Sequence, residues 1–320
     1  MSGLIDPGRI TLRLGVDADV IVGADVRSQR PLAMASRFVG RPVCTVIEAV
    51  GLLHAVCGRS HAAALRLAAA AASDETIPAD ERRAWTIRLA AERIGEHLRE
   101  LYRTESDAGR LDRARAAIAQ AQTIARSGQM QDGATAVFTA ALRPTTIDVA
   151  AAAVDALTAA DDATVVAALA ADTAFERLPT ITDRQPEVGP AARLGGSAAG
   201  SGATEAARWQ EIVMALDTLA AADGPLWYAA GRWATDGGFA AVESPRGRLY
   251  YVVRIGDDGR LVDARVLAPT EWNFHPTGPF IRSLIGWRPA GDRRAAVVRR
   301  AQDFCPCVTV EVEEGDGADA

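Results

Sequence analysis

Two short groups of thiol and imidazole side chains are the residues of this chain most suited to chemistry. His54, Cys57 and His61 lie within eight residues, at the junction of two predicted helices, and Cys305 and Cys307 flank a single proline about 250 residues later. His-x-x-Cys spacing turns both side chains toward one ion across a helical turn, and an extended backbone points residues i and i+2 to the same side. Thiolate and imidazole are ligands for soft and borderline metals, so the spacing predicts one metal site closed by chain topology.

Other interpretations of these residues stay open at this level. A His-x-x-Cys pair beside an alanine-rich helix is commonly structural, and Cys-Pro-Cys suits either metal or redox chemistry or a buried pair of small side chains. Cys44, beside Val43 and Val46 on a helical apolar face, is expected in the core, and His97 is expected to be a packed or solvated helix residue. Composition and spacing alone indicate a soluble, mostly helical protein that could hold a thiolate metal site.

The composition excludes several classes of protein. All 35 basic residues are arginines, against 41 acidic residues, so the net charge is −6. This balance excludes a general nucleic-acid binder, which shows a basic face. The absence of lysine excludes a Walker A loop and a Schiff-base enzyme. No uncharged apolar run is long enough to span a bilayer, so no membrane association is expected, and the four cysteines suit a reducing cytoplasm better than a disulfide framework.

The hydrophobic periodicity predicts a helical body with a small sheet built from both ends of the chain. Residues 9–28 alternate apolar and polar side chains around a turn and predict a β-hairpin. Residues 237–269 predict three strands joined by short turns, and another strand follows Cys307. Residues 179–204 collect Pro, Gly, Ser and Ala without a period and predict a mobile loop, and the acidic residues 314–320 predict a frayed tail. Helices are predicted over 43–53, 60–72, 80–102, 107–127, 145–170, 205–222, 278–285 and 291–303.

Five segments, taken in order, resemble motifs of one known family. A hairpin leads into QRPLAMASRFVGRP, and LLHAVCGRSH around Cys57 follows. The helix AERIGEHLREL, the segment PTEWNFHP from Pro269 to Pro276 and the C-terminal Cys305–Pro306–Cys307 complete the order. The chain thereby resembles the large subunit of nickel–iron hydrogenases, and more closely its degenerate relatives, the HupK-type hydrogenase expression/formation proteins.

The resemblance implies an α+β fold, a mainly helical, large-subunit-like single domain over residues 1–320. In it the N-terminal hairpin, the strands of residues 237–269 and the C-terminal strand are expected to share one small sheet. It also implies that Cys57 lies near Cys305 and Cys307 despite their separation along the chain.

The thiolate count departs from that of the catalytic family. There, four thiolates hold nickel, and two of them bridge to an iron that carries cyanide and carbon monoxide. Here His54 stands at the first position of the first Cys-x-x-Cys motif and Cys57 at the second; in the alternative register Cys57 is first and Ser60 second. At the other end Cys307 takes the first position and Val310 replaces the second cysteine. Nickel and hydrogenase activity are therefore not expected.

The resemblance implies that the three thiols and the nearby histidine that remain of the family's site bind iron transiently. The resemblance implies a non-catalytic, cytoplasmic maturation scaffold that holds or protects iron, as Fe(CN)2CO or its precursor, during assembly of the hydrogenase large subunit, together with other maturation proteins. Arg59 is the candidate donor to such an anionic fragment at the rim of the site. The implied metal ligands are Cys57, Cys305, Cys307, His54 and His61.

Two further functions stay open. The first is a metal-free mimic of the large subunit that recruits hydrogenase chaperones, with Trp227, Tyr228 and Trp233 as a docking patch. The second is a dithiol oxidoreductase that uses Cys305 and Cys307, although one intervening residue would strain the disulfide ring. Removal of the cysteines separates a scaffold from a mimic, because only the scaffold needs the thiols.

Overall fold

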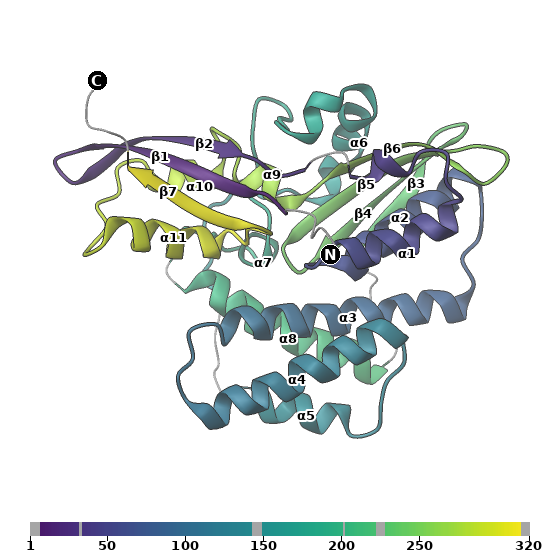
Figure 1. The fold of residues 1–320 in the computed structure, drawn as a ribbon, viewed down its shortest axis with the longest axis horizontal. Helices are drawn as coiled ribbons and strands as arrows, with labels where there is room; N and C mark the ends of the chain where they lie inside the picture. The colour runs from purple at the N-terminus through teal and green to yellow at the C-terminus, as the bar shows by residue number, and fades with distance from the viewer. Residues whose placement is uncertain (1–6, 32–33, 143–148, 201, 222–227, 315–320) are drawn as a thin grey trace, which may run out of the picture.

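The computed structural model describes residues 7–31, 34–142, 149–200, 202–221 and 228–314. A four-stranded sheet and a three-stranded sheet lie side by side, and a bundle of helices lies against them (Figure 1).

The four-stranded sheet is covered by helices on both faces. It is antiparallel, in the order β3 (Tyr228–Ala234), β4 (Gly237–Ser244), β5 (Gly247–Ile255), β6 (Leu261–Leu267). Helices α1 (Val43–Leu53) and α2 (Gly58–Ala72) pack on one face, and α6 (Asp162–Ala171) and α9 (Pro269–Asn273) on the other. Because both faces are covered, β4 and β5 are buried over most of their length, which explains the nearly continuous apolar run LYYVV in β5.

Alanines bring α2 unusually close to the sheet. A Cβ atom at Gly238 of β4 would lie 2.0 Å from the carbonyl oxygen of Ala68, so strand and helix backbones are almost in contact. At the other end of α2, the ring of His61 reaches the hydroxyl of Tyr251 on β5. This packing holds the first turn of α2 beside the turn between β4 and β5.

The helical bundle contains the longest helices. It consists of α3 (Ala79–Leu101), α4 (Ala108–Ser127), α5 (Ala134–Ala141) and α8 (Ala203–Ala221), which bury an apolar cluster between them. Small side chains allow close helix packing here too, since a Cβ at Gly95 of α3 would lie 3.2 Å from the Cβ of Ala121 on α4.

The three-stranded sheet joins the two ends of the described chain. Its order is β2 (Val20–Ser28), β1 (Arg9–Asp17), β7 (Thr309–Glu314), with β1 and β7 parallel. Helices α10 (Pro279–Leu284) and α11 (Arg293–Asp303) supply the side chains that pack on it. Cys305 and Cys307 lie between α11 and β7. The pairing of β7 with β1 therefore fixes the position of both cysteines in the fold.

Most predicted elements are confirmed, and two expectations are wrong. The hairpin, the three strands of residues 237–267 and the helices around 60–72, 80–102 and 107–127 are present with small boundary shifts. The hairpin and the C-terminal strand, however, pair with each other and form a second sheet rather than joining the strands of 237–269, because each satisfies the other's backbone groups.

The predicted helix over 145–170 is the second error. Helix α6 begins only at Asp162, after a short 3-10 helix that a capping box between Thr158 and Asp161 starts; such a box sets a helix start whatever the helix propensity of the alanines before it. Residues 145–148 lie outside the described residues. Strand β3 and helix α5 were not predicted.

The segment predicted as a mobile loop packs into the body. Residues 179–200 are largely irregular, as expected, but they contain the short helix α7 (Pro190–Arg193), and residues 186–192 are all buried. Mobility itself stays a prediction for 179–204, and most of the acidic tail, 315–320, lies outside the described residues.

Cys44, predicted in the core, is exposed because α1 buries only the side that carries Val46 and Val50.

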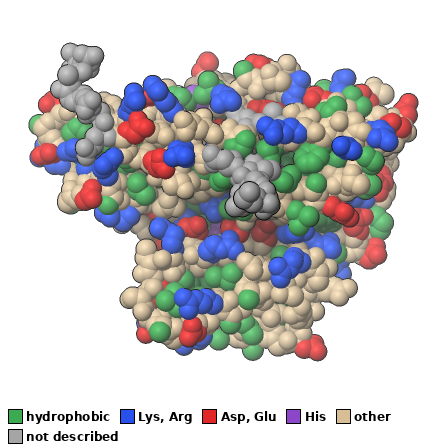
Figure 2. All heavy atoms as spheres, in the orientation of Figure 1, with side chains coloured by type: hydrophobic (Ala, Val, Ile, Leu, Met, Phe, Trp, Pro, Cys, Tyr) green, Lys and Arg blue, Asp and Glu red, His purple; other side chains and the backbone are tan. Residues whose placement is uncertain are grey.

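Basic and acidic side chains are interspersed on the face shown in Figure 2. Among the described residues, no helix combines the length and the apolar character needed to cross a membrane.

Candidate functional site

Cys57 occupies a strained position between two helices. It directly precedes α2 and adopts the left-handed conformation, with φ of 57°. The next residue must be small, because a Cβ at Gly58 would lie 2.5 Å from the carbonyl oxygen of Gly51 on α1. The close approach of α1 and α2 thus forces a sharp turn at Cys57 and buries its side chain, which is 5% exposed.

Cys305 repeats this conformation at the other end of the chain, with φ of 53°. The described non-glycine residues with positive φ are otherwise exposed, so Cys57 and Cys305 are the buried ones. A left-handed non-glycine residue costs about 1–3 kcal/mol, and such strain concentrates at functional sites. The two cysteines therefore share a buried backbone conformation that costs free energy.

The Trp-Asn-Phe segment holds the C-terminal cysteines. The Asn273 amide, fully buried, donates hydrogen bonds to the carbonyl oxygens of Val188 (2.8 Å) and Phe304 (2.9 Å) and accepts one from the Val188 N–H. Thr270, in the same helix α9, donates to Cys307 Sγ at 3.2 Å. A motif singled out from the sequence is thus the clamp that positions Cys305 and Cys307.

The guanidinium of Arg246, in the turn between β4 and β5, lies beside the Cys305–Pro306–Cys307 segment. Its Nη1 donates to the carbonyl oxygen of Pro306 at 2.9 Å, between Cys305 and Cys307. Burial raises the pKa of Cys57, and the Arg246 guanidinium acts in the opposite direction and lowers that pKa. Arg246 is 9% exposed, and its Nε has no hydrogen-bond partner in the described part of the chain. A buried cation with an unused donor therefore contacts the Cys305–Pro306–Cys307 segment and acts electrostatically on Cys57.

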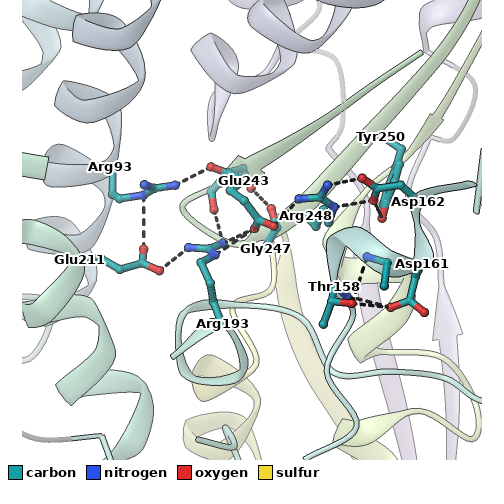
Figure 3. A network of polar contacts seen from close by, with 12 residues as sticks. Arg93, Thr158, Asp161, Asp162, Arg193, Glu211, Glu243, Gly247, Arg248 and Tyr250 are labelled. Carbon is teal, nitrogen blue, oxygen red and sulfur yellow. Dashed lines mark hydrogen bonds and ion pairs between the residues drawn. The ribbon is translucent and has the colours of Figure 1, made fainter. Parts of the chain in front are cut away.

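A buried network of ion pairs fixes the turn that carries Arg246 (Figure 3). Arg93 of α3 donates to the backbone carbonyl of Glu243, and Arg193 of α7 to that of Ser244 at 2.9 Å. The Glu243 carboxylate accepts from Arg193 at 2.9 Å and from Arg248 at 2.7 Å. Helices α3 and α7 thus hold the end of β4 from two sides.

The network extends from Glu243 toward α8 on one side and toward α6 on the other (Figure 3). Glu211 of α8 pairs with Arg93 and Arg193, while Arg248 pairs with Asp162 of α6, which also accepts from the Tyr250 hydroxyl at 2.8 Å. Burial would raise the pKa of Glu211, but Arg193 and Arg93 outweigh it and lower the pKa to about 2. The turn before Arg246 is therefore anchored to the bundle and to α6 by fully charged partners.

The Cys57 thiol is protonated near pH 7. Burial raises its pKa well above the ordinary value, and the nearby guanidinium of Arg246 offsets this only in part. Cys305 lies 3.3 Å from Nη2 of Arg208, another buried arginine. Because a thiol must lose its proton to bind a metal, any metal bound at Cys57 displaces a proton.

The two predicted histidine ligands pair with each other. The rings of His54 and His61 stack with centroids 3.6 Å apart. His54 Nδ1 lies 2.9 Å from the Val50 carbonyl oxygen, and His61 Nδ1 lies 2.9 Å from the Tyr251 hydroxyl. Burial lowers the pKa of both imidazoles, so both are neutral near pH 7.

Arg59, the predicted rim donor, lines a cavity that Cys57 also lines. Its backbone N–H donates to Glu92 at 2.6 Å, and the Ser60 N–H and hydroxyl donate to the same carboxylate, at 2.9 and 2.5 Å. Glu92 of α3 thus binds the first turn of α2, directly after Cys57. Burial raises the pKa of Glu92 to about 7 despite these hydrogen bonds.

The described residues contain no group of three or more His, Cys, Asp or Glu side chains arranged to hold a metal ion. Arg246 contacts the Cys305–Pro306–Cys307 segment through the Pro306 carbonyl oxygen, but the cysteines of the described residues do not form a closed coordination shell. The metal site of Cys57, Cys305, Cys307, His54 and His61 therefore stays a prediction, as does the role of Arg59. The donor set that the geometry does offer is thiol sulfur beside guanidinium N–H, which suits a ligand that brings both a metal and anionic groups.

The sequence did not point to Arg246. It stands in the turn SPRGR, which predicted a tight connection, but no spacing links it to a cysteine. The proposed aromatic docking patch is also not formed by the described residues, since Tyr228 packs against the α2 side of the sheet and Trp233 against the α6 side. Trp227 lies outside the described residues.

Comparison with known proteins identifies relatives over the whole chain. No protein-family model matches it. The chain is 33% identical to the hydrogenase expression/formation protein HupK of Rhizobium leguminosarum bv. viciae, over 100% of both chains. The chain belongs to the HupK family of hydrogenase expression/formation proteins. The HupK proteins of Bradyrhizobium diazoefficiens and Azotobacter vinelandii are each 31% identical, over 91% and 96% of this chain and 91% and 98% of their own length.

Solved structures show which fold the HupK family member has. The NiFeSe hydrogenase of Desulfomicrobium baculatum superposes with a TM-score of 0.60 at 16% identity, covering 92% of this chain and 95% of its own. That of Desulfovibrio vulgaris Hildenborough gives a TM-score of 0.59 at 13% identity, covering 92% and 94%. The fold is the α+β fold of nickel–iron hydrogenase large subunits.

Proposed function

We propose that this HupK family member is a non-catalytic maturation scaffold. It holds or protects the iron fragment Fe(CN)2CO, or its precursor, in the cytoplasm during assembly of the nickel–iron hydrogenase large subunit, and it works with other maturation proteins. The fragment is cargo, received and passed on.

The observation that carries this proposal is the buried Arg246 guanidinium, which donates to the backbone between Cys305 and Cys307 and acts electrostatically on Cys57. Thiolate sulfur from Cys57, Cys305 or Cys307 suits low-spin iron, and the free Nε–H of a buried guanidinium suits an anionic ligand on that iron. An unpaired donor buried beside strained cysteines costs free energy unless something occupies it part of the time. Cargo would supply the missing partner.

The same geometry argues against hydrogen activation. Val310, which stands where the catalytic family has its fourth thiolate, packs in the core with the three-stranded sheet. Three thiols cannot supply the four-sulfur nickel site of the catalytic large subunits. A smaller ligand set, with Cys57 protonated when free, also favours release over permanent retention.

An infrared spectrum of the protein, purified without oxygen from cells that carry the hydrogenase operon, tests the proposal. We expect cyanide and carbonyl stretching bands together with iron in the same sample, and loss of both in Cys57→Ser and Cys307→Ser variants. Cys44→Ser is the matched control, because Cys44 is exposed on α1. Absence of bands and iron from a protein that still captures hydrogenase chaperones would contradict the scaffold and favour the metal-free mimic.

A further inference from the structure

A cavity of about 300 Å³ lies between the α1–α2 junction and helices α3 and α4. Its volume is at the lower end of the range for small-molecule sites. Cys57 lines it, next to Gly58 and the alanines of α3 and α4, so the cavity gives the Cys57 side chain a route to the outside that does not pass through the sheet.

The charges along this cavity are unevenly paired. Of its two carboxylates, Glu96 is paired with Arg99 at 2.6 Å and with Arg246 at 3.5 Å, and Glu92 accepts the hydrogen bonds of the first turn of α2. Arg59 and Arg126, from α2 and the last turn of α4, also line the cavity. In the described part of the chain, neither guanidinium forms an ion pair or a hydrogen bond. Glu92 accepts only from neutral donors, so the lining sets Arg59, Arg99 and Arg126 against Glu92 and Glu96, and its net charge is positive.

We propose that this cavity is the entry route for a small anion to Cys57, and that Arg59 and Arg126 attract the anion. A cleft lined by unpaired cations with low-dielectric walls raises the local concentration of anions and their association rate by about tenfold or more at low salt. The identity of the anion as the iron fragment rests on the proposed function; the attraction of a small anion to Cys57 does not.

Alkylation of Cys57 measures this attraction directly. Iodoacetate and iodoacetamide are similar in size and react with the same thiolate by displacing iodide, but only iodoacetate is an anion. The ratio of the two rates at Cys57, followed by peptide mass spectrometry on the folded protein, cancels the low intrinsic reactivity of a buried thiol. Cys44, exposed on α1, gives the reference ratio within the same sample.

We expect an Arg59→Gln/Arg126→Gln double variant to lower the iodoacetate-to-iodoacetamide ratio at Cys57 about three- to tenfold, with the iodoacetamide rate unchanged. The effect should shrink as salt is raised to 0.5 M. An Arg115→Gln variant is the control, since Arg115 is 72% exposed on α4 and pairs with Asp112 away from the cavity. Its ratio should equal that of the unmodified protein.

Two results would overturn the inference. One is an equal ratio in the double variant and the unmodified protein; the other is no Cys57 adduct with either reagent while Cys44 reacts. Failure of the proposed function looks different, because a protein without iron or infrared bands would still show the arginine-dependent ratio. Conversely, iron that binds with no effect of the two arginines would leave the scaffold intact and move the entry route elsewhere.

Discussion

The ion-pair network of Figure 3 and the cysteine site beside it are both buried and polar, yet their polar groups are paired very differently. In the network, each carboxylate pairs with at least one guanidinium, and Glu211 and Glu243 each pair with two. At the cysteine site, Arg246 keeps a free Nε–H, two cysteines are strained and a cavity opens to Cys57. The difference indicates that the network stabilises the fold, and it supports the proposal that the cysteine site binds a ligand.

The largest expected effect is on the network. Glu211→Gln leaves Arg93 and Arg193 without their shared buried counter-charge, and breaking one member of such a pair costs about 3–5 kcal/mol of unfolding free energy. Urea denaturation measures the loss. Glu313→Gln, which removes an exposed partner of Arg13, should leave the free energy of unfolding nearly unchanged, because solvent screens this ion pair. Similar losses for the two variants would contradict the structural role of the network.

Acid should weaken the same network through His97, whose Nε2 lies 2.7 Å from Glu211. Burial lowers the pKa of His97 from 6.5 to about 4, so between these values the unfolded chain takes up a proton that the folded chain does not. The contribution of His97 to the free energy of unfolding is therefore complete above pH 6.5. It falls by up to about 3 kcal/mol as the pH drops toward 4. Urea midpoints at pH 7, 5.5 and 4.5 should fall less steeply for His97→Gln; parallel curves would refute this assignment.

The turn at Cys57 should be sensitive to one methyl group. Gly58→Ala places a Cβ 2.5 Å from the carbonyl oxygen of Gly51, and this overpacking should cost about 1–3 kcal/mol and displace Cys57. Gly23→Ala on β2 is the control, since a Cβ there has no neighbour within 4 Å. Thermal denaturation compares the two, and equal melting temperatures would mean that α1 and α2 are not held as closely as described.

The smallest effect on stability is expected at the centre of the cysteine site. Arg246→Gln removes the hydrogen bond to Pro306 but leaves Glu96 paired with Arg99 and Glu100 with Arg103, so neither carboxylate loses its last counter-charge. We expect a loss of about 1 kcal/mol. Iron content, measured on the same preparation, should nevertheless fall severalfold. A stability loss as large as that of Glu211→Gln, with iron unchanged, would make Arg246 another member of the network.

Local patterns predicted much of the fold and less of the site. The alternation of residues 9–28 and the periodicity of α2, α3 and α4 are properties of short windows, so they were readable from the sequence. The pairing of β1 with β7 joins residues about 300 positions apart, and no local pattern records it.

The residues of the site were also predictable where a local pattern marked them and unpredictable where long-range packing places them. The cysteines were singled out because thiols are scarce, and the resemblance placed them in one region. Arg246 was missed because its approach to Cys57 and Cys305 depends on how α2 packs on the sheet and how Arg93 and Arg193 hold the turn. The sequence also could not show that His54 and His61 would stack on each other.

Transfer of cargo tests the central claim most directly. Protein purified without oxygen would be mixed with iron-free hydrogenase large subunit and separated again, with infrared spectra and iron content recorded for both chains. The scaffold predicts that the cyanide and carbonyl bands leave this protein and appear on the large subunit, and that Cys57→Ser protein transfers nothing while Cys44→Ser protein transfers normally. Bands that never appear on this chain, or that stay on it in the presence of the acceptor, would contradict the account.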